Sequence, residues 1–460
     1  MKQQNLRIYT KIKKINGVLI NMKKKIRFIS IVILSILILS ACSKSGDEKS
    51  IEALKASIIP INTVEYGNGF EDLMPLKNIL KDKKIVAMGE ATHGTSEFFK
   101  MKHRFFEFLV EEMGYRVFAM ECDGGAGQVI NEYILNGKGN LNDCLEAVKY
   151  DVFTTEEVKS MIKWMKEYND DPSHKEKIKF YGMDNVNIVD TLPKLSYYLE
   201  KLDKELQTKI EEDTLNTIYR NDIKAITNEQ LDSILLNINE IKKDMENSKE
   251  KYFNNNLQNE YELAIWNLNL VSQCAEYYIE VNKSVDQMVQ SVAAMNLRDK
   301  YMAANVKWIQ EHEGKLGNDK VMLWAHNIHV SSMDDIYKYM GKNLKEMYGD
   351  EYYSIGFEFS RGSFNASDMS TGTMTRFDTD NNTPEYLAYK FDRTEIPISF
   401  LDFNSASKNK EVSKILSKNQ TFSLITAFYD ESIQKSFQYI PKNLFDGLIY
   451  IKETTPSKIQ

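Results

Sequence analysis

Cysteine is rare in this chain, with only 4 residues among 460. Three of them, Cys122, Cys144 and Cys274, lie beyond the first 50 residues and form neither a C-x-x-C pair nor an even set. A disulfide framework and a structural zinc cluster are therefore both disfavoured. We expect these three side chains to be buried as small hydrophobic residues.

Several motifs of known chemistry are also missing. The sequence has no G-x-S-x-G segment, which disfavours a typical serine esterase. It has neither a G-x-x-x-x-G-K-[ST] phosphate loop nor an H-E-x-x-H metal motif. Residues 124–127 read GGAG but lack the G-x-G-x-x-G spacing, so they are weak evidence for a dinucleotide site.

The composition is that of a large globular protein. Hydrophobic residues make up 42% of the chain and aromatic residues 11%, enough for a large core or for a core with an inserted subdomain. The first 41 residues contain nine Lys and Arg residues and no acid. Without them, 50 bases face 66 acids and the net charge is near −16. Such an acidic chain would repel a polyanion, so we expect no nucleic-acid partner.

The N-terminus has the pattern of a secretory signal peptide. Residues 22–42 read MKKKIRFISIVILSILILSAC, a basic start followed by a short apolar run and small residues. The segment Leu39-Ser40-Ala41-Cys42 resembles a bacterial lipobox. We therefore predict a signal peptide over 1–41, a lipid-modified Cys42, a tether over 42–65, and an extracytoplasmic lipoprotein anchored to the membrane. An uncleaved signal anchor remains the alternative, and the better context of Met22 leaves open that 1–21 precede the true start.

Apolar runs and amphipathic segments alternate along the rest of the chain. Two segments, 96–113 and 155–169, have apolar residues at helical spacing. Continuous apolar runs typical of strands buried on both faces occur at 83–88, 116–120, 177–183, 320–325, 352–359, 397–401 and 447–451. This order predicts an α/β fold with a mainly parallel sheet flanked by helices.

A long segment interrupts this alternation. We predict that 66–190 and 311–460 form the α/β core, and that 191–310 form an antiparallel helical subdomain inserted between the third and fourth predicted strands. The oligomeric state is not indicated by the sequence.

Polar side chains follow the predicted strands. Open α/β sheets bind ligands outside the carboxyl ends of their strands, so we expect these residues to converge on one crevice. The turn GEATHG leaves its strand sharply, and we expect Gly89 and Gly94 to supply unusual dihedral angles there. The residues at these strand ends are Glu90, His93, Glu121, Asp184, His326, His329 and Glu358.

A carboxylate beside an imidazole can fix its tautomer and let it take a proton from water. Glu90 and His93 are the candidate pair, while His326 and His329 could stabilise an oxyanion or take up a proton. Lys102, Arg104 and Arg298 could supply positive charge for substrate binding, with Asp184 and Glu358 as further candidates. His103, His174 and His312 are interpreted as surface residues.

Two alternatives remain open at this point. Each strand-end residue could have a structural role, such as capping a helix or holding a turn. The same residue types could also hold a divalent metal, through Glu90, His93, Glu121, His326 and His329. Spacing alone does not decide between a metal site and a metal-free base, and we favour the metal-free base without a cofactor.

Ordered segments resemble the erythromycin esterase family. They are GEATHGTSEFFKMKHRFFEFLVEEMGYRVFAMECD (89–123), INEYILNGKGNL, LRDKYMAANVKWI, VMLWAHNIHVS, SIGFEFSRGSF and FDGLIYIKETTPS. The resemblance runs from about residue 70 to the end and implies an α/β fold with a helical insertion and a cleft between them.

Characterised members of that family open a macrolide lactone by hydrolysis, with a motif histidine as the proposed base. The resemblance assigns that role to His93, the accompanying acids to Glu90 and Glu121, and the late histidines to His326 and His329. Lys102 stands where the resistance enzymes are expected to have Arg, and Lys lacks the planar guanidinium fork. Some family members are linked to polysaccharide biosynthesis.

Our hypothesis is a hydrolase that cleaves a small-molecule carboxylic ester or macrolide lactone with water activated by His93. The alternative is an extracytoplasmic lipoprotein that binds a ligand in the same cleft, or that takes part in envelope polysaccharide metabolism without macrolide esterase activity.

Overall fold

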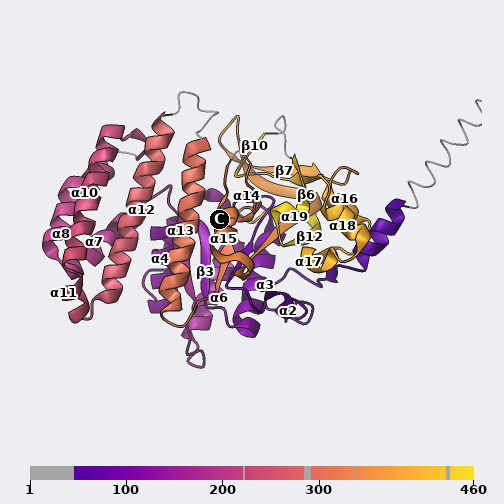
Figure 1. Ribbon diagram of the computed structural model, residues 1–460, viewed down its shortest axis with the longest axis horizontal. Coiled ribbons are helices and arrows are strands. Elements are labelled where there is room, and N and C mark those ends of the chain that lie inside the picture. The colour runs from indigo at the N-terminus through magenta and orange to yellow at the C-terminus, as the bar shows by residue number, and fades with distance from the viewer. Residues whose placement is uncertain (1–45, 221–222, 284–291, 336, 431–435) are drawn as a thin grey trace, which may run out of the picture.

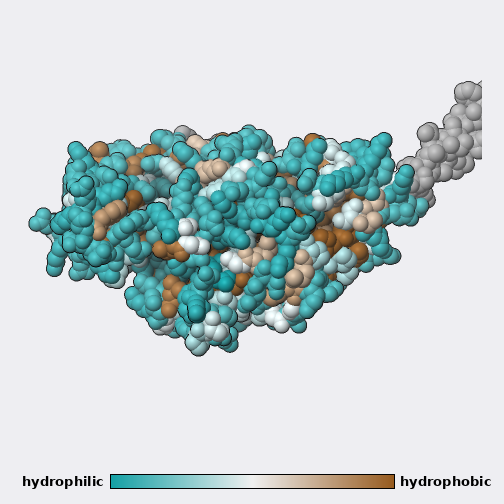
Figure 2. Space-filling model, turned by 60° about the horizontal axis from the view of Figure 1, so that its bottom comes forward, coloured by the Kyte–Doolittle hydropathy of each residue, from teal (hydrophilic) through white to brown (hydrophobic). Residues whose placement is uncertain are grey.

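The computed structural model describes residues 46–220, 223–283, 292–335, 337–430 and 436–460 (Figure 1). The predicted signal peptide and Cys42 lie outside these ranges. Among the helices of the described ranges, none combines the length and the apolar character that crossing a membrane requires. The face of the molecule in Figure 2 is mainly hydrophilic, with small scattered groups of apolar residues.

A central sheet forms the core of the fold. Six neighbouring strands in it pair in parallel, and two more continue one edge in antiparallel orientation. This arrangement confirms the predicted α/β class. The strands lie side by side in the order β1 (Ile59–Pro60), β8 (Ile398–Asp402), β12 (Gly447–Thr454), β6 (Tyr352–Asp368), β2 (Ile85–Met88), β5 (Val321–Trp324), β3 (Val117–Asp123) and β4 (Lys179–Asp184).

Each of the predicted apolar runs contains a strand of this sheet. Strands β2, β3 and β5 are buried along their whole length, as expected for strands covered by helices on both faces. β6 is longer than predicted. Its second half leaves the parallel sheet and pairs with β7 (Met374–Asp380) and β10 (Phe428–Tyr429), which form an arm beside the core.

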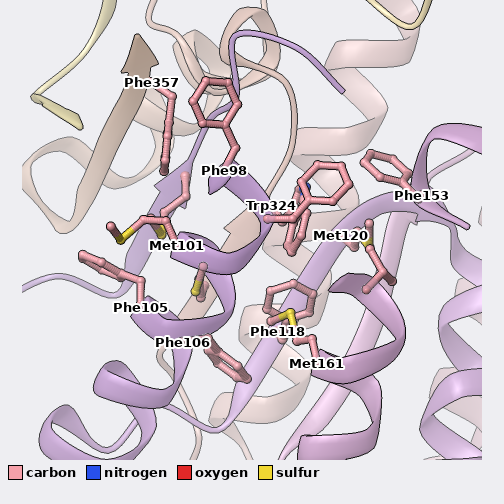
Figure 3. Close-up of a cluster of buried hydrophobic side chains, with 14 of the residues drawn as sticks. Phe98, Met101, Phe105, Phe106, Phe118, Met120, Phe153, Met161, Trp324 and Phe357 are labelled. Carbon is pink, nitrogen blue, oxygen red and sulfur yellow. The ribbon is translucent and has the colours of Figure 1, made fainter. Parts of the chain in front are cut away.

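Alternate residues of the strands pack on opposite faces of the sheet. Val86 and Met88 join an aromatic cluster with α3 (Ser96–Met113) and α6 (Glu156–Asp170), part of which Figure 3 shows. Ile85 and Ala87 point to the other face, where α13 (Val292–Gly314) and α15 (Met340–Tyr348) cover the sheet. The two helices predicted from sequence, α3 and α6, are confirmed.

Helices occupy the segment between β4 and β5. They have a hydrophobic core of their own, which includes Leu199, Ile238 and Leu268. In Figure 1 this helical part lies to the left of the sheet, and α13 runs along its border with the α/β core. Before α13 the helices are α7 (Thr191–Leu202), α8 (Lys204–Ile210), α9 (Asn216–Arg220), α10 (Asn228–Asn247), α11 (Lys249–Asn254) and α12 (Gln258–Lys283).

The predicted tether over 42–65 needs correction in its described part. Residues 46–55 form a helix, and Leu54 is completely buried within the core cluster on the α13 face. β1 follows and pairs with β8. Residues 46–65 therefore belong to the folded core. Apolar side chains such as Ile51, Leu54 and Ile58 were the signal that distinguished them from a solvated linker.

Gly89 and Gly94 border the turn that follows β2. Neither has a positive φ, so the predicted dihedral role is wrong. The glycines instead allow close approach. A Cβ on Gly94 would lie 1.9 Å from the carbonyl oxygen of Asn365, and one on Gly89 would lie 2.2 Å from Oδ1 of Asn327. The turn is thus pressed against β6 and against α14 (Asn327–Val330).

Candidate active site

Glu90 and His93 form a close pair immediately after β2. Nδ1 of His93 lies 2.6 Å from Oε1 of Glu90. The other carboxylate oxygen of Glu90 accepts hydrogen bonds from Nζ of Lys102 at 2.5 Å and from Nε1 of Trp324 at 3.0 Å. A carboxylate can only accept at Nδ1, so the proton of a neutral His93 ring is held there and Nε2 keeps its lone pair.

His93 is 8% exposed, whereas Glu90 is completely buried. In the described part of the chain Nε2 of His93 has no hydrogen-bond partner, and His93 lines a cavity of about 650 Å³. The pair therefore has the geometry of a general base whose reactive nitrogen is available at the cavity.

Lys102 lies behind this pair and does not line the cavity. It is completely buried, and its Nζ also lies 4.5 Å from the centre of the Trp324 ring. Burial lowers the pKa of Lys102 to about 8, although the neighbouring carboxylate of Glu90 favours the charged form. The predicted contact of Lys102 with substrate is not what the structure shows, because the ammonium group binds Glu90 instead.

A second cluster surrounds Glu121, which lies near the end of β3. Oε1 of Glu121 accepts from Arg298 at 2.9 Å, and Oε2 accepts from the backbone N–H of His326 at 2.9 Å. Arg298 also donates three hydrogen bonds to Asp184, of which the shortest is 2.6 Å. Burial alone would raise the pKa of Glu121, but His329, His93 and Arg298 together hold it well below its ordinary value.

His329 lies between two carboxylates. Its Nδ1 is 2.8 Å from Asp299, and its Nε2 is 3.2 Å from Glu121. Burial would lower the pKa of His329, but these two acids raise it to about 10. His329 is therefore an imidazolium at neutral pH, and both of its N–H groups have an acceptor. Together with Arg298 it brings positive charge to the cavity wall.

His326 differs from His329 in its environment. Its Nδ1 accepts from the backbone N–H of Ile328 at 3.3 Å, and its Nε2 lies 3.2 Å from the carbonyl oxygen of Ile425. Burial and the nearby His93, whose ring centre is 4.8 Å away, hold the pKa of His326 well below its ordinary value. This neutral ring is occupied by backbone partners, so it supports the turn rather than presenting a spare donor.

The cavity lies at the carboxyl ends of β2, β3 and β5, between the sheet and the helical part. His93, Glu121, Arg298, His326 and His329 all reach it. Its remaining walls are largely aromatic and apolar. They come from the segment before α6, from α12, α13 and the arm, and include Tyr150, Phe153, Tyr277, Met295, Met374 and Phe428. Segments far apart in the sequence thus meet here, as expected for an open α/β sheet.

Besides Lys102, three more of the predicted substrate-binding residues do not line the cavity. Arg104 binds Asp72 and the carbonyl oxygens of Thr63 and Gly69 on the outer side of α3. Glu358 is completely buried beside Ser423, and burial raises its pKa to about 8. Asp184 reaches the site through Arg298 and through Tyr150, whose hydroxyl donates to it at 3.4 Å. The predictions for Arg104 and Glu358 as substrate contacts are therefore wrong.

The interpretation of His103 and His312 as surface residues is also wrong. His103 is 1% exposed and stacks on Tyr66, while His312 is 7% exposed and binds Glu262. Conversely, Cys122, Cys144 and Cys274 are buried free thiols, as predicted.

Sequence reasoning missed two polar partners of the site. Asp299 directly follows Arg298 in LRDKY, and Trp324 lies two residues before His326 in VMLWAHNIH. Both could have been found from the sequence, because each lies one or two positions from a residue already identified as a candidate. What the sequence could not show is that Asp299 faces His329 while Trp324 faces Glu90.

The candidate metal ligands are not arranged as a metal site in the part of the chain that the structure describes. In those ranges no three His, Cys, Asp or Glu side chains are grouped so that they could hold one ion. The candidate ligands are instead each bound to other protein groups. Both oxygens of Glu90 are occupied, as are both nitrogens of His326 and of His329.

The sheet, the helical insertion and the acid–base cluster between them define an α/β protein with a candidate active site at the carboxyl ends of its strands. The sequence profile of the erythromycin esterase family matches residues 110–454. The chain belongs to this family, and the membership indicates a hydrolase. The matched range begins after the Glu90–His93 turn, so the argument for that pair comes from the geometry above.

Two curated relatives agree with this assignment. The chain is 27% identical over 350 residues to erythromycin esterase type II of Escherichia coli, an alignment that covers 72% of this chain and 82% of the relative. It is 26% identical over 420 residues to the putative hydrolase YbfO of Bacillus subtilis, which covers 85% and 88% of the two chains.

Solved structures show the same fold. A Bacillus cereus protein (TM-score 0.80) and a succinoglycan biosynthesis protein (TM-score 0.78) are each 27% identical, and each alignment covers 90% of this chain and 99% of the other. A His-to-Asn mutant of an erythromycin esterase in its open conformation has a TM-score of 0.63 at 15% identity, over 84% and 94% of the two chains. At that identity the likeness concerns the fold alone.

Proposed function

We propose that this protein hydrolyses a carboxylic ester or a lactone with a water molecule activated by His93. The observation that carries the proposal is the 2.6 Å contact between Glu90 and Nδ1 of His93, which leaves Nε2 as the basic nitrogen at the cavity. The relative that supports it is the erythromycin esterase type II of Escherichia coli, to which the chain is 27% identical.

In the proposed reaction, Nε2 of His93 removes a proton from water as the oxygen attacks the carbonyl carbon. Glu90 stabilises the imidazolium that forms. The carbonyl oxygen becomes an oxyanion, and the positive charge of Arg298 and of protonated His329 favours its formation. The C–O bond to the alcohol then breaks, and the departing alkoxide takes the proton from His93. The products are a carboxylic acid and an alcohol, and the base is restored.

The substrate is proposed by class only. Tyr150, Phe153, Tyr277 and Phe428 give the cavity broad aromatic surfaces that suit a large, partly apolar molecule such as a macrolide. An acylated envelope polysaccharide is the second candidate, because one structural neighbour is described as a succinoglycan biosynthesis protein.

Substrate profiling of residues 46–460 tests this proposal. A panel of aryl esters, macrolides and acylated saccharides should contain at least one compound that is hydrolysed, with one ¹⁸O atom from labelled water in the acid product. Binding of several panel members without turnover of any would contradict the proposal and favour the ligand-binding alternative.

We further propose that the reaction needs no metal ion. The basis is that Glu90, Glu121, His326 and His329 already have protein partners at every ring nitrogen or carboxylate oxygen. Dialysis against EDTA should therefore leave kcat/KM unchanged. Elemental analysis before and after dialysis is the control, and a loss of activity that follows loss of a bound metal would overturn this point.

The protein is further proposed to be an extracytoplasmic lipoprotein held to the membrane through Cys42. The basis is the sequence pattern of residues 22–42. In cells fed labelled palmitate, the wild-type protein should carry the label. The Cys42→Ser variant should stay unlabelled and be found in the soluble fraction. Equal labelling of both proteins, or of neither, would contradict the anchor.

A further inference from the structure

Trp324 is the last residue of β5 and is 1% exposed. Figure 3 shows it in the middle of an aromatic cluster, close to Phe118 and Phe153. A tryptophan in a core usually contributes only apolar area, but its N–H still needs an acceptor there. The acceptor of Trp324 is Oε2 of Glu90, at 3.0 Å.

The indole ring has little freedom to leave this acceptor. Its centre lies 4.9 Å from the ring of Phe99, 6.2 Å from that of Phe118 and 6.3 Å from that of Phe153. Nζ of Lys102 lies 4.5 Å from the ring centre. Packing on several sides therefore fixes the direction of the N–H bond, as is required of a group that positions a catalytic neighbour.

We propose that Trp324 is a positioning residue for the base, acting through Glu90. Its N–H and Nζ of Lys102 both bind Oε2, so the carboxylate is held with Oε1 on Nδ1 of His93. Trp324 does not line the cavity, so its proposed part in the reaction is indirect. This inference rests on the proposed function, because it assigns Trp324 a part in the same reaction.

The hydrogen bond also affects how basic His93 is. An N–H donated to a carboxylate withdraws negative charge from it, so Glu90 favours protonation of His93 less strongly. Glu121 and His326 also interact electrostatically with His93, and Tyr150, Arg298 and His329 line the same cavity, but the Trp324 N–H is bonded to Glu90 and to none of these. Loss of the indole N–H should therefore act on the base through Glu90 alone.

The test is Trp324→Phe, which keeps an aromatic ring and removes the N–H. We expect kcat/KM to fall about tenfold, the effect of losing one hydrogen bond to a charged group. The acidic limb of the pH profile of kcat/KM should move to higher pH, because the more basic carboxylate of Glu90 keeps His93 protonated up to a higher pH. Trp266→Phe is the matched control, since Trp266 is equally buried at 1% exposure but stacks on Trp308, and its N–H does not bind Glu90. It should lower the melting temperature and leave the limb in place.

A double-mutant cycle shows whether the effect passes through Glu90. In a Glu90→Gln background, Trp324→Phe should cost much less than in the wild type. An equal fold-loss in both backgrounds, or an unmoved acidic limb in Trp324→Phe, would overturn the inference. If Trp324→Phe does not fold, uniform replacement of tryptophan by 5-fluorotryptophan gives an isosteric, stronger donor. The limb should then move to lower pH, and an unmoved limb would count against Trp324.

The two proposals fail differently. If His93→Ala keeps the wild-type rate, His93 is not the base and the proposed reaction fails. If His93→Ala is inactive while Trp324→Phe has a wild-type pH profile, the reaction stands and only the role of Trp324 is lost.

Discussion

Replacement of His93 by alanine should lower kcat/KM for the best substrate by about two to four orders of magnitude, the usual contribution of a positioned general base. The variant loses the nitrogen that removes the proton from water. It keeps Arg298 and His329, which still offer positive charge to the oxyanion. The residual rate should therefore remain above that of the uncatalysed reaction, as measured with an activated aryl ester.

Two controls separate catalysis from folding in this experiment. His93 is buried in a turn that packs on β6, so the melting temperature of His93→Ala must be measured beside its rate. His174→Ala is the matched histidine variant, because His174 stacks on Tyr168 and does not line the cavity. It should keep a wild-type rate. Added imidazole should restore part of the activity of His93→Ala, and a folded variant with wild-type turnover would exclude His93 as the base.

The strands of the core could be predicted because they are buried on both faces. A run such as residues 83–88 has no alternation, and only a covered parallel strand suits it. The order of the strands in the sheet could not be predicted from the sequence. β5 follows the helical insertion by chain order yet lies between β2 and β3. Because β5 lies between β2 and β3, His326 and His329, which follow it, lie next to Glu121 and His93.

The site could be predicted where it depended on the strand ends, and not where it depended on helix faces. Lys102 and Arg104 were assigned one role because both lie early on α3. Residues two apart on a helix point to nearly opposite sides. Lys102 accordingly reaches Glu90 just after the end of β2, while Arg104 reaches Asp72 in the segment before β2. The helical geometry already excluded a shared substrate contact for these two side chains.

Polar composition was a poor guide to exposure. His103 lies among Lys and Arg residues on α3, yet Tyr66 covers its ring at a centroid distance of 4.1 Å. Tyr66 comes from the segment before the first predicted strand, and Trp164 of α6 lies on another side of the ring, at a centroid distance of 5.5 Å. The residues that bury this part of α3 thus lie elsewhere in the chain, so the polar neighbours of His103 in sequence did not indicate its burial.

The largest effect on stability is expected for Glu121→Gln. Glu121 is buried and accepts from Arg298, His329 and the backbone of His326. Loss of its charge leaves the positive charges of Arg298 and His329 with only Asp184 and Asp299 as partners. Removing one member of a buried ion pair typically costs about 3–5 kcal/mol. Calorimetric unfolding should show this loss, whereas Glu453→Gln, which breaks the exposed pair with Arg361, should cost about 0–1 kcal/mol.

The dependence of this loss on pH distinguishes the charge network from simple packing. The pKa of Glu121 is below its ordinary value of 4.5 in the folded state, so its stabilising effect is present above pH 4.5 and disappears as the pH falls through the lower value. The pKa of His329 is raised from 6.5 to about 10, so its contribution is complete below pH 6.5 and is lost as the pH rises to about 10. The stability difference between wild type and Glu121→Gln should consequently be largest between pH 4.5 and 6.5 and smaller on both sides. A difference that stays constant from pH 4 to 10 would mean that Glu121 stabilises the fold through its shape, and that the positive charge assigned to His329 is wrong.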